Sequence, residues 1–230
     1  MTYSDHHPRI ELCCFDMAGT TVEDGGLVFR AFQGTIEDLE VAEDDHGWMT
    51  TYVLETMGQS KIDVFTHLFG ERAALANARF EHHFVVSATE HGVEEIPGAT
   101  ACFEALAEAG IALALTTGFS PATREVLLEM LDWGDRFVAT VSPADVGRGR
   151  PAPDMVLSCA MAAKVTSVMN VAVVGDTWSD MAAGHRAGAS RCLGVLSGTD
   201  LAERLVDGGA TTILASVATA PPLLVGPANP

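Results

Sequence analysis

The segment IELCCFDMAGTTV, residues 10–22, begins with the apolar run IELCCF and becomes polar at Asp16. Further apolar runs follow at residues 111–115, 137–141, 171–174 and 190–196. Segments with helical periodicity lie between the later runs, at 99–109, 121–131, 153–163 and 179–187. Continuous apolar strands that alternate with helices are typical of a parallel sheet with helices on both faces. The sequence therefore predicts an α/β fold.

The long distance between the first two apolar runs predicts an insertion. Between residues 15 and 111, only residues 99–109 suit a crossover helix beside the sheet. Residues 27–91 have helical spacing and no clear strand, and Pro97-Gly98 follows them. We interpret this stretch as a helical insertion at the edge of the sheet's active face.

The composition limits the class of protein. Of the 230 residues, 48% are hydrophobic and 19% are charged, which suits a buried core and excludes disorder for the bulk of the chain. A formal net charge of −18 repels nucleic-acid phosphates and anionic lipids, so neither is expected as a partner. A phosphate site in such a chain needs local positive charge, for which a metal ion is the expected source.

Localisation signals and cysteines point to a cytoplasmic protein. The N-terminal residues 1–8 lack the features of a signal peptide, and no apolar run approaches the roughly 20 residues that span a bilayer. The five cysteines form no CxxC motif. The neighbouring Cys13 and Cys14 are expected on opposite faces of one strand, as buried, reduced thiols.

Polar residues follow the predicted strands at the end where parallel sheets bind ligands. They are Asp16, the group Thr116-Thr117-Gly118, Arg150 before a helix, and the group 175–180 that contains Asp176 and Asp180. Alone, each has a structural alternative, such as a turn cap, a helix-start hydroxyl, a solvated charge or an acid that suits the helix dipole. Together, after successive strands, they favour one shared site.

This set of groups suits phosphoryl transfer through a covalent aspartyl intermediate. A carboxylate such as Asp16 can attack phosphorus when its own charge and that of the phosphate are offset. Mg²⁺ prefers oxygen ligands, which Asp16 and Asp176 supply. Thr117 and the guanidinium of Arg150 can hold the remaining phosphoryl oxygens.

The chain resembles the haloacid dehalogenase (HAD) superfamily of hydrolases. The resemblance rests on FDMAGTTV (15–22), Thr116-Thr117, GRP (149–151) and GDTWSD (175–180), which together span nearly the whole chain. It implies a Rossmann-like parallel sheet core with an inserted helical cap domain. The implied boundaries are 9–24 and 97–216 for the core, 25–96 for the cap, and 1–8 and 217–230 for loose termini.

The resemblance also implies roles for individual residues. Asp16 is the implied nucleophile, and Thr117 is preferred to Thr116 as the phosphoryl-binding hydroxyl. The implied Mg²⁺ ligands are Asp16, the carbonyl of Ala18, Asp176 and Asp180. The implied phosphoryl-binding residues are Thr117, Arg150, Gly19, Thr20 and Gly118. The implied cap contacts to substrate are Met57 and Gly58, beside Lys61.

The residue at position 18, an alanine, indicates which branch of the family the chain resembles. Phosphomonoesterases of this superfamily carry an acid–base Asp two residues after the nucleophile, whereas Ala18 cannot transfer a proton. The phosphonatase-like (phosphonoacetaldehyde hydrolase-like) branch has Ala there. The segment 57–63, MGQSKID, also resembles that branch's cap loop, in which the residue corresponding to Lys61 forms a Schiff base with an aldehyde. Such an iminium can accept the electrons of a broken P–C bond, provided that the attacking amine is neutral.

Three regions of the chain depart from the phosphonatase pattern. Val64 stands where those enzymes have His, Gly25 and Gly26 lie where a Cys is found, and Phe119 replaces an aromatic hydroxyl. Lys61 therefore keeps two alternatives, a Schiff-base residue or a cation that binds substrate phosphate.

The sequence leaves three functions in order of preference. The first is a Mg²⁺-dependent hydrolase of a small phosphonate or related metabolite, and the second is a phosphatase for a small sugar or metabolite phosphate. The third is a non-catalytic binding protein, which the intact set of Asp16, Thr117, Arg150 and Asp176 disfavours. A phosphoglucomutase-like role needs the acid that Ala18 lacks. The sequence does not fix the oligomeric state, and a homodimer is one alternative.

Overall fold

Six parallel strands form the central sheet. The computed structural model describes residues 8–23 and 25–225, and the strand order within them is β3-β2-β1-β4-β5-β6. Every neighbouring pair in this order is parallel. The strands are β1 (Leu12–Asp16), β2 (Ala112–Thr116), β3 (Ala139–Val141), β4 (Val171–Gly175), β5 (Arg191–Val195) and β6 (Thr212–Leu214). The predicted α/β class with a Rossmann-like parallel sheet is confirmed.

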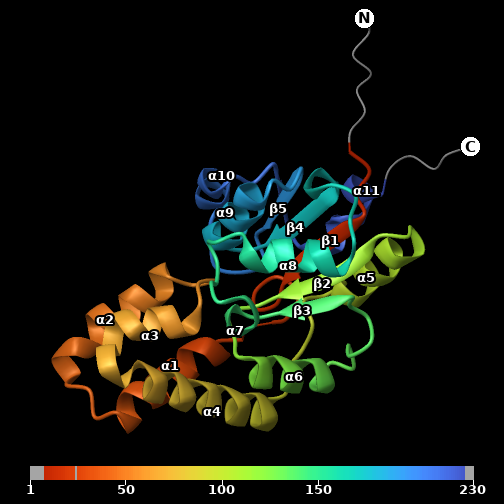
Figure 1. Ribbon diagram of the computed structural model, residues 1–230. Helices are drawn as coiled ribbons and strands as arrows, with labels where there is room; N and C mark the ends of the chain where they lie inside the picture. The colour runs from red at the N-terminus through yellow and green to blue at the C-terminus, as the bar shows by residue number, and fades with distance from the viewer. Residues whose placement is uncertain (1–7, 24, 226–230) are drawn as a thin grey trace, which may run out of the picture.

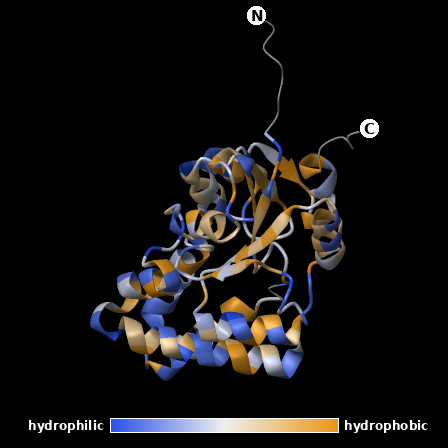
Figure 2. Cartoon of the chain, turned by 45° about the vertical axis from the view of Figure 1, so that its right-hand side comes forward, coloured by the Kyte–Doolittle hydropathy of each residue, from blue (hydrophilic) through white to orange (hydrophobic). Residues whose placement is uncertain are grey.

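Helices cover both faces of the sheet (Figure 1). Helix α5 (Ala99–Glu108) packs on one face, where Phe103 lies edge-on to Phe15 at 5.1 Å between ring centroids. Helices α8 (Asp154–Ala162) and α9 (Trp178–Ala187) pack on the other. The neighbouring Cys13 and Cys14 belong to these two separate clusters, as the strand prediction requires. Because both faces of the sheet are buried, its strands are almost continuously hydrophobic (Figure 2).

Four helices lie between β1 and α5, beside the sheet. They are α1 (Leu27–Asp38), α2 (Glu43–Glu55), α3 (Lys61–Phe69) and α4 (Ala73–His91), with the 3-10 turn η1 (Gly70–Arg72) before α4. We call α1–α4 the cap helices. They form a separate group below the sheet in Figure 1, and their own apolar residues, such as Phe32, Phe65 and Phe80, are buried.

The remaining helices are α6 (Pro121–Met130), α7 (Pro143–Val146), η2 (Val168–Asn170), α10 (Ala202–Gly208), η3 (Val217–Thr219) and α11 (Pro221–Leu224). They lie between the later strands or, in the case of η3 and α11, after the last strand. Within residues 8–23 and 25–225, no helix combines the length and the apolarity that crossing a membrane requires.

The C-terminal segment differs from the prediction of a loose end at 217–230. Residues 217–224 form η3 and α11, and Val217, Ala220 and Leu224 are buried in the main hydrophobic cluster. The prolines that suggested a loose end instead begin a short helix, since Pro suits the first helical turn. Of the predicted loose termini, residues 1–7 and 226–230 lie outside the described part of the chain.

The order of the strands decides where a ligand binds. The chain builds outward from β1 to β2 and β3 on one side, and to β4, β5 and β6 on the other, so the connections reverse direction between β1 and β4. In open parallel sheets, ligands bind at this reversal, beyond the carboxyl ends of the strands. Asp16 is the last residue of β1 and Asp176 directly follows β4, so both lie at this point.

Candidate active site

Three carboxylates meet at the reversal between β1 and β4. Asp16, Asp176 and Asp180 are buried, and they offer oxygen atoms that all lie within 4.8 Å of one another. Asp180 joins the other two because it lies in the first turn of α9, where it forms a capping box with Thr177. The sheet and one helix start therefore position the whole cluster.

Hydrogen bonds fix the orientation of Asp176. The hydroxyl of Thr20 donates to its Oδ1 at 2.8 Å, and the backbone N–H of Thr199 donates to its Oδ2 at 2.8 Å. Thr199 lies in the loop after β5, and the preceding Gly198 packs so closely on Asp176 that an added Cβ would collide with its carboxylate. Asp176 is therefore held from two neighbouring loops.

Arg150 brings the positive charge to this cluster. Its Nη1 donates to Asp16 Oδ1 at 2.5 Å and also to Asp180 Oδ1. The guanidinium is buried, and its Nε has no acceptor among the residues that the structure describes. A buried donor without a partner costs free energy, so an acceptor from outside the chain would be stabilised there.

Burial, and then repulsion between the carboxylates, shifts the pKa values of Asp16 and Asp176. Burial, with the charges of Asp180 and Asp176, raises the pKa of Asp16 well above its usual range, and Arg150 opposes this only in part. Burial and then the neighbouring Asp180 raise the pKa of Asp176 to about 6. Burial alone would lower the pKa of Arg150, but Asp16 and Asp180 raise it, so the guanidinium stays charged.

The stability of the metal-free protein should fall as pH rises. A carboxyl whose pKa in the folded state is raised stabilises the fold below its ordinary pKa, and this contribution is lost as pH rises through the folded-state value. For Asp176 the window runs from its ordinary 3.8 to about 6, which corresponds to about 3 kcal/mol. Urea unfolding in a chelator at pH 4–7 measures this. An equally steep loss in Asp176→Asn would contradict the assignment.

The cluster fits a divalent cation with oxygen ligands. Three buried carboxylates share one guanidinium, so the site lacks positive charge when all are ionised. Carboxylate oxygens are the ligands that Mg²⁺ prefers, and a dication would offset the repulsion that raises the pKa values. Ala18, the predicted carbonyl ligand, lines the same cavity as Asp16 and Asp176.

A small cavity opens between the carboxylate cluster and the cap helices. It brings together nine of the predicted site residues: Asp16, Ala18, Met57, Gly58, Lys61, Thr117, Gly118, Arg150 and Asp176. Its other lining residues were not predicted as site residues: Val28, Gln59, Phe119, Thr177 and Thr199. The roles of the predicted residues stay predictions, but the structure places them around one space.

Three predicted residues do not line this cavity. Asp180 lies behind it, bonded to Arg150 and to the N–H of Thr177. The Thr20 hydroxyl is bonded to Asp176, so this side chain supports a carboxylate of the cluster. Gly19 has φ of 84°, and an added Cβ would lie 2.6 Å from Asp176 Oδ2, so this glycine is required for close packing.

The two neighbouring threonines after β2 differ in orientation. Thr116 donates weakly to the carbonyl of Phe15, at 3.5 Å, and so is turned toward β1. Thr117 lines the cavity, and its hydroxyl accepts the N–H of Phe119 at 3.3 Å, which leaves its own proton available to a substrate oxygen. The geometry favours Thr117 as the phosphoryl-binding hydroxyl.

The loop 57–61 of the cap packs directly on the loops that carry these groups. The Lys61 N–H donates to the carbonyl of Gly118, at 3.4 Å. An added Cβ on Gly118 would lie 2.6 Å from the carbonyl oxygen of Gln59, and one on Gly149 would lie 2.6 Å from the Ser60 Cβ. Two core glycines, each next to a predicted phosphoryl-binding residue, therefore allow the cap loop to close the cavity.

Lys61 lies at the cap side of the cavity. Its ammonium nitrogen is 5.9 Å from the ring centroids of both Phe80 and Phe119. Aromatic faces attract a cation, and the acidic Asp16 and Asp176 line the same space. Lys61 and two carboxylates of the cluster therefore line one space.

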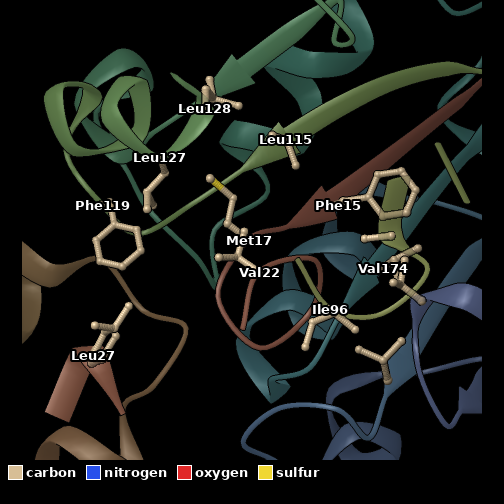
Figure 3. Close-up of a cluster of buried hydrophobic side chains, with 14 of the residues drawn as sticks. Phe15, Met17, Val22, Leu27, Ile96, Leu115, Phe119, Leu127, Leu128 and Val174 are labelled. Carbon is tan, nitrogen blue, oxygen red and sulfur yellow. The ribbon is translucent and has the colours of Figure 1, made fainter. Parts of the chain in front are cut away.

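A second link joins the cap helices to the loop after β2. Phe119 packs on Phe84 of α4 at 4.5 Å between ring centroids, and Figure 3 shows it at the edge of the core cluster that faces Leu27 of α1. Glu81 of α4 accepts hydrogen bonds from the N–H of Ser120 at 3.0 Å, from its hydroxyl at 2.9 Å, and from the hydroxyl of Thr123. A carboxylate of cap helix α4 thus binds the N-terminal end of core helix α6. No sequence signal indicates this contact, because it depends on tertiary packing.

Removing this carboxylate should loosen the cap. Glu81→Ala removes the acceptor of the Ser120 N–H and of the Ser120 and Thr123 hydroxyls. We therefore expect a loss of about 1–2 kcal/mol in unfolding free energy and a raised KM. Glu90→Ala, an exposed position on the same helix, is the matched control. Urea unfolding and steady-state kinetics of both variants measure the effect. Equal behaviour of the two variants would show that the Glu81 contacts contribute nothing.

The sequence and the fold both match known proteins. Over residues 10–188 the sequence matches the hydrolase family described as haloacid dehalogenase-like hydrolase. Phosphonoacetaldehyde hydrolase of Bacillus cereus (strain AH187) is 28% identical over 195 residues, which cover 78% of this chain and 74% of that protein.

Solved structures share the fold. A phosphonoacetaldehyde hydrolase like protein from Oleispira antarctica has a TM-score of 0.81 and 23% identity, and the match covers 97% of this chain and 95% of that one. CbbY from Rhodobacter sphaeroides, in complex with phosphate, has a TM-score of 0.77 and 22% identity, with coverage of 92% and 96%.

Proposed function

The chain belongs to the haloacid dehalogenase-like hydrolases, and we propose on that premise that it hydrolyses a small phosphonate through an aspartyl-phosphate on Asp16. The main support is Arg150. Its buried Nε lacks an acceptor among the described residues, and Arg150 lines the same cavity as Asp16 and Thr117. A phosphoryl oxygen is an acceptor that suits this donor. The resemblance to phosphonoacetaldehyde hydrolase names the substrate class.

The predicted Mg²⁺ fits the acidic cluster. Asp16, Asp176, Asp180 and the carbonyl of Ala18 are the residues proposed to hold it. A bound dication would neutralise the carboxylates and the phosphoryl group, so that two anions can approach each other. Arg150 and Thr117 would orient the phosphoryl group from the opposite loops.

Ala18 and Lys61 support cleavage of a P–C bond. Ala18 lies in the cavity and offers no proton for an alcohol leaving group. The whole chain contains only two lysines, Lys61 and Lys164, against eleven arginines, and one of the two lines this cavity. An arginine would bind an anion equally well, whereas only lysine can lose its proton and condense with a carbonyl.

The proposed reaction balances with one molecule of water consumed. The Lys61 amine adds to the substrate carbonyl and releases water, which gives an iminium. The Asp16 carboxylate attacks phosphorus, the P–C bond breaks, and its electron pair moves to the iminium nitrogen as an enamine. Protonation of the enamine carbon and hydrolysis of the iminium release the carbonyl product, and a second water hydrolyses the aspartyl-phosphate.

A phosphatase for small phosphate esters is the second candidate. The position of Lys61 between Phe80 and Phe119 favours the charged amine, which binds an anion rather than a carbonyl. In that case Lys61 would contact a second anionic group of the substrate. The two candidates share Asp16, Arg150 and the metal cluster, and they differ in the leaving group and in the role of Lys61.

A phosphate-release assay tests the proposal. Phosphonoacetaldehyde and a panel of small phosphate esters are supplied with Mg²⁺, and again with excess chelator. We expect phosphate from the phosphonate, and none in the chelator. Release from esters alone would select the phosphatase, and full activity in chelator would contradict the metal assignment.

A further inference from the structure

A second, apolar cavity lies inside the cap, next to the catalytic one. Its walls come from all four cap helices and the loop after α2: Val28, Phe32, Val53, Val64, Phe65 and Phe80, with Thr56 and Lys61. The six apolar side chains are all buried. The Thr56 hydroxyl donates to the carbonyl of Tyr52 at 2.7 Å, so its hydrogen is already used. Lys61 is therefore the one cation among the residues of this wall.

Lys61 and Val28 line both cavities. The ammonium nitrogen lies 5.9 Å from the ring of Phe80, which lines the apolar cavity, and 5.9 Å from the ring of Phe119, which lines the catalytic one. The reactive nitrogen thus stands where the two spaces adjoin. A carbon atom bonded to this nitrogen therefore lies between the catalytic cavity and the apolar cavity.

The chemistry of an iminium carbon fits this arrangement. That carbon bears the Lys61 nitrogen, the CH₂ group that leads to phosphorus, and one further substituent. The guanidinium of Arg150 binds the phosphoryl end in the catalytic cavity, next to the nucleophile Asp16. The third substituent then points toward the apolar cavity. For an aldehyde this substituent is hydrogen, which leaves the apolar space unfilled and forfeits its dispersion contacts.

The apolar cavity has room for one group about as large as a water molecule or a methyl group. Water would be poorly stabilised there, because the wall offers few polar partners. A methyl group would gain the contacts of Val28, Val64 and Phe80. We propose that the substrate is a methyl ketone, a 2-oxopropyl-type phosphonate, rather than the corresponding aldehyde. This inference rests on the proposed phosphonate cleavage.

The reaction keeps the balance given above. Lys61 condenses with the ketone and releases water. Asp16 then attacks phosphorus, the phosphoryl group is transferred to Asp16, and the electron pair of the broken P–C bond forms the enamine. Protonation and hydrolysis then release acetone, phosphate and the free amine. No oxidant, reductant or further reactant is needed.

A pair of substrates tests the methyl group directly. Phosphate release is measured with 2-oxopropylphosphonate and with phosphonoacetaldehyde under the same conditions. One methyl group in an apolar pocket changes kcat/KM by about 10–200-fold, and we expect the ratio to favour the ketone by at least about 10-fold. Equal values, or a preference for the aldehyde, would overturn the inference and leave phosphonate cleavage standing. Release from neither compound would remove the proposed function and this inference with it.

Filling the cavity provides an independent check. Val64→Ile adds one carbon to the cavity wall, and Val86→Ile adds one at an exposed position of α4 as the matched control. We expect Val64→Ile to lower the ketone-to-aldehyde ratio by about 10-fold or more and Val86→Ile to leave it unchanged. A loss of stability in Val64→Ile would lower both activities together and not their ratio. An unchanged ratio in a folded Val64→Ile variant would contradict the placement of the methyl group.

Discussion

Asp16→Asn is expected to release no measurable phosphate from any substrate, with a loss of at least about 10⁴-fold in kcat, in a protein that folds normally. The amide cannot attack phosphorus, and it is nearly isosteric with the carboxylate. In the metal-free protein the same change removes one of three clustered, buried carboxylates, where burial and the charges of Asp180 and Asp176 raise the pKa of Asp16 well above its usual range. We therefore expect Asp16→Asn to unfold at a higher temperature than the unmutated chain in chelator at pH 7.

The combination of these two results is specific. A residue needed only for folding would lower both stability and activity, whereas a buried nucleophile lowers activity alone. Asp135→Asn, at an exposed position, makes the same chemical change and serves as the control. Turnover is followed by phosphate release and stability by thermal unfolding. Near-normal turnover in Asp16→Asn would show that the covalent mechanism is wrong.

The strand pattern predicted the sheet and five of the residues that line the cavity, Asp16, Thr117, Gly118, Arg150 and Asp176, whereas the family resemblance supplied Ala18, Met57, Gly58 and Lys61. Strands buried on both faces are continuously apolar, so β1 and β4 could be located without a structure. The groups that follow such strands meet at one edge of the sheet, so the sequence predicts that Asp16 and Asp176 lie close together. The short edge strand β6 escaped prediction, because its three residues are only half-buried.

Other features depend on tertiary contacts that leave no local pattern. The Thr199 N–H reaches Asp176 from the loop after β5, and Glu81 reaches Ser120 from another part of the chain. Phe119 was recognised as a departure from an aromatic hydroxyl, but its packing on Phe84 appears only when α4 is placed beside the loop. Each of these residues acts through a partner far away in sequence.

Lys61→Arg distinguishes the two proposed roles of Lys61, formation of an iminium and binding of an anion. A guanidinium keeps the charge and cannot condense with a carbonyl, so a phosphonatase should lose on the order of 10³-fold or more in kcat. A phosphatase in which Lys61 binds an anion should retain much of its kcat and show the loss mainly in KM. Lys164→Arg is the control, since Lys164 is exposed and is the other lysine of the chain.

Chemical trapping completes this test, and the composition of the chain makes the result easy to interpret. Borohydride reduces an iminium to a stable amine, so a carbonyl substrate plus borohydride should inactivate the enzyme irreversibly and add mass to the peptide that contains Lys61. The peptide that contains Lys164 measures non-specific reductive alkylation in the same sample, because the chain has only these two lysines. Modification of Lys61 alone, together with an inactive Lys61→Arg, would establish the covalent role. An active Lys61→Arg variant, together with the absence of an adduct on Lys61 in the unmutated enzyme, would exclude the iminium and with it the ketone preference, while the chemistry of Asp16 would still stand.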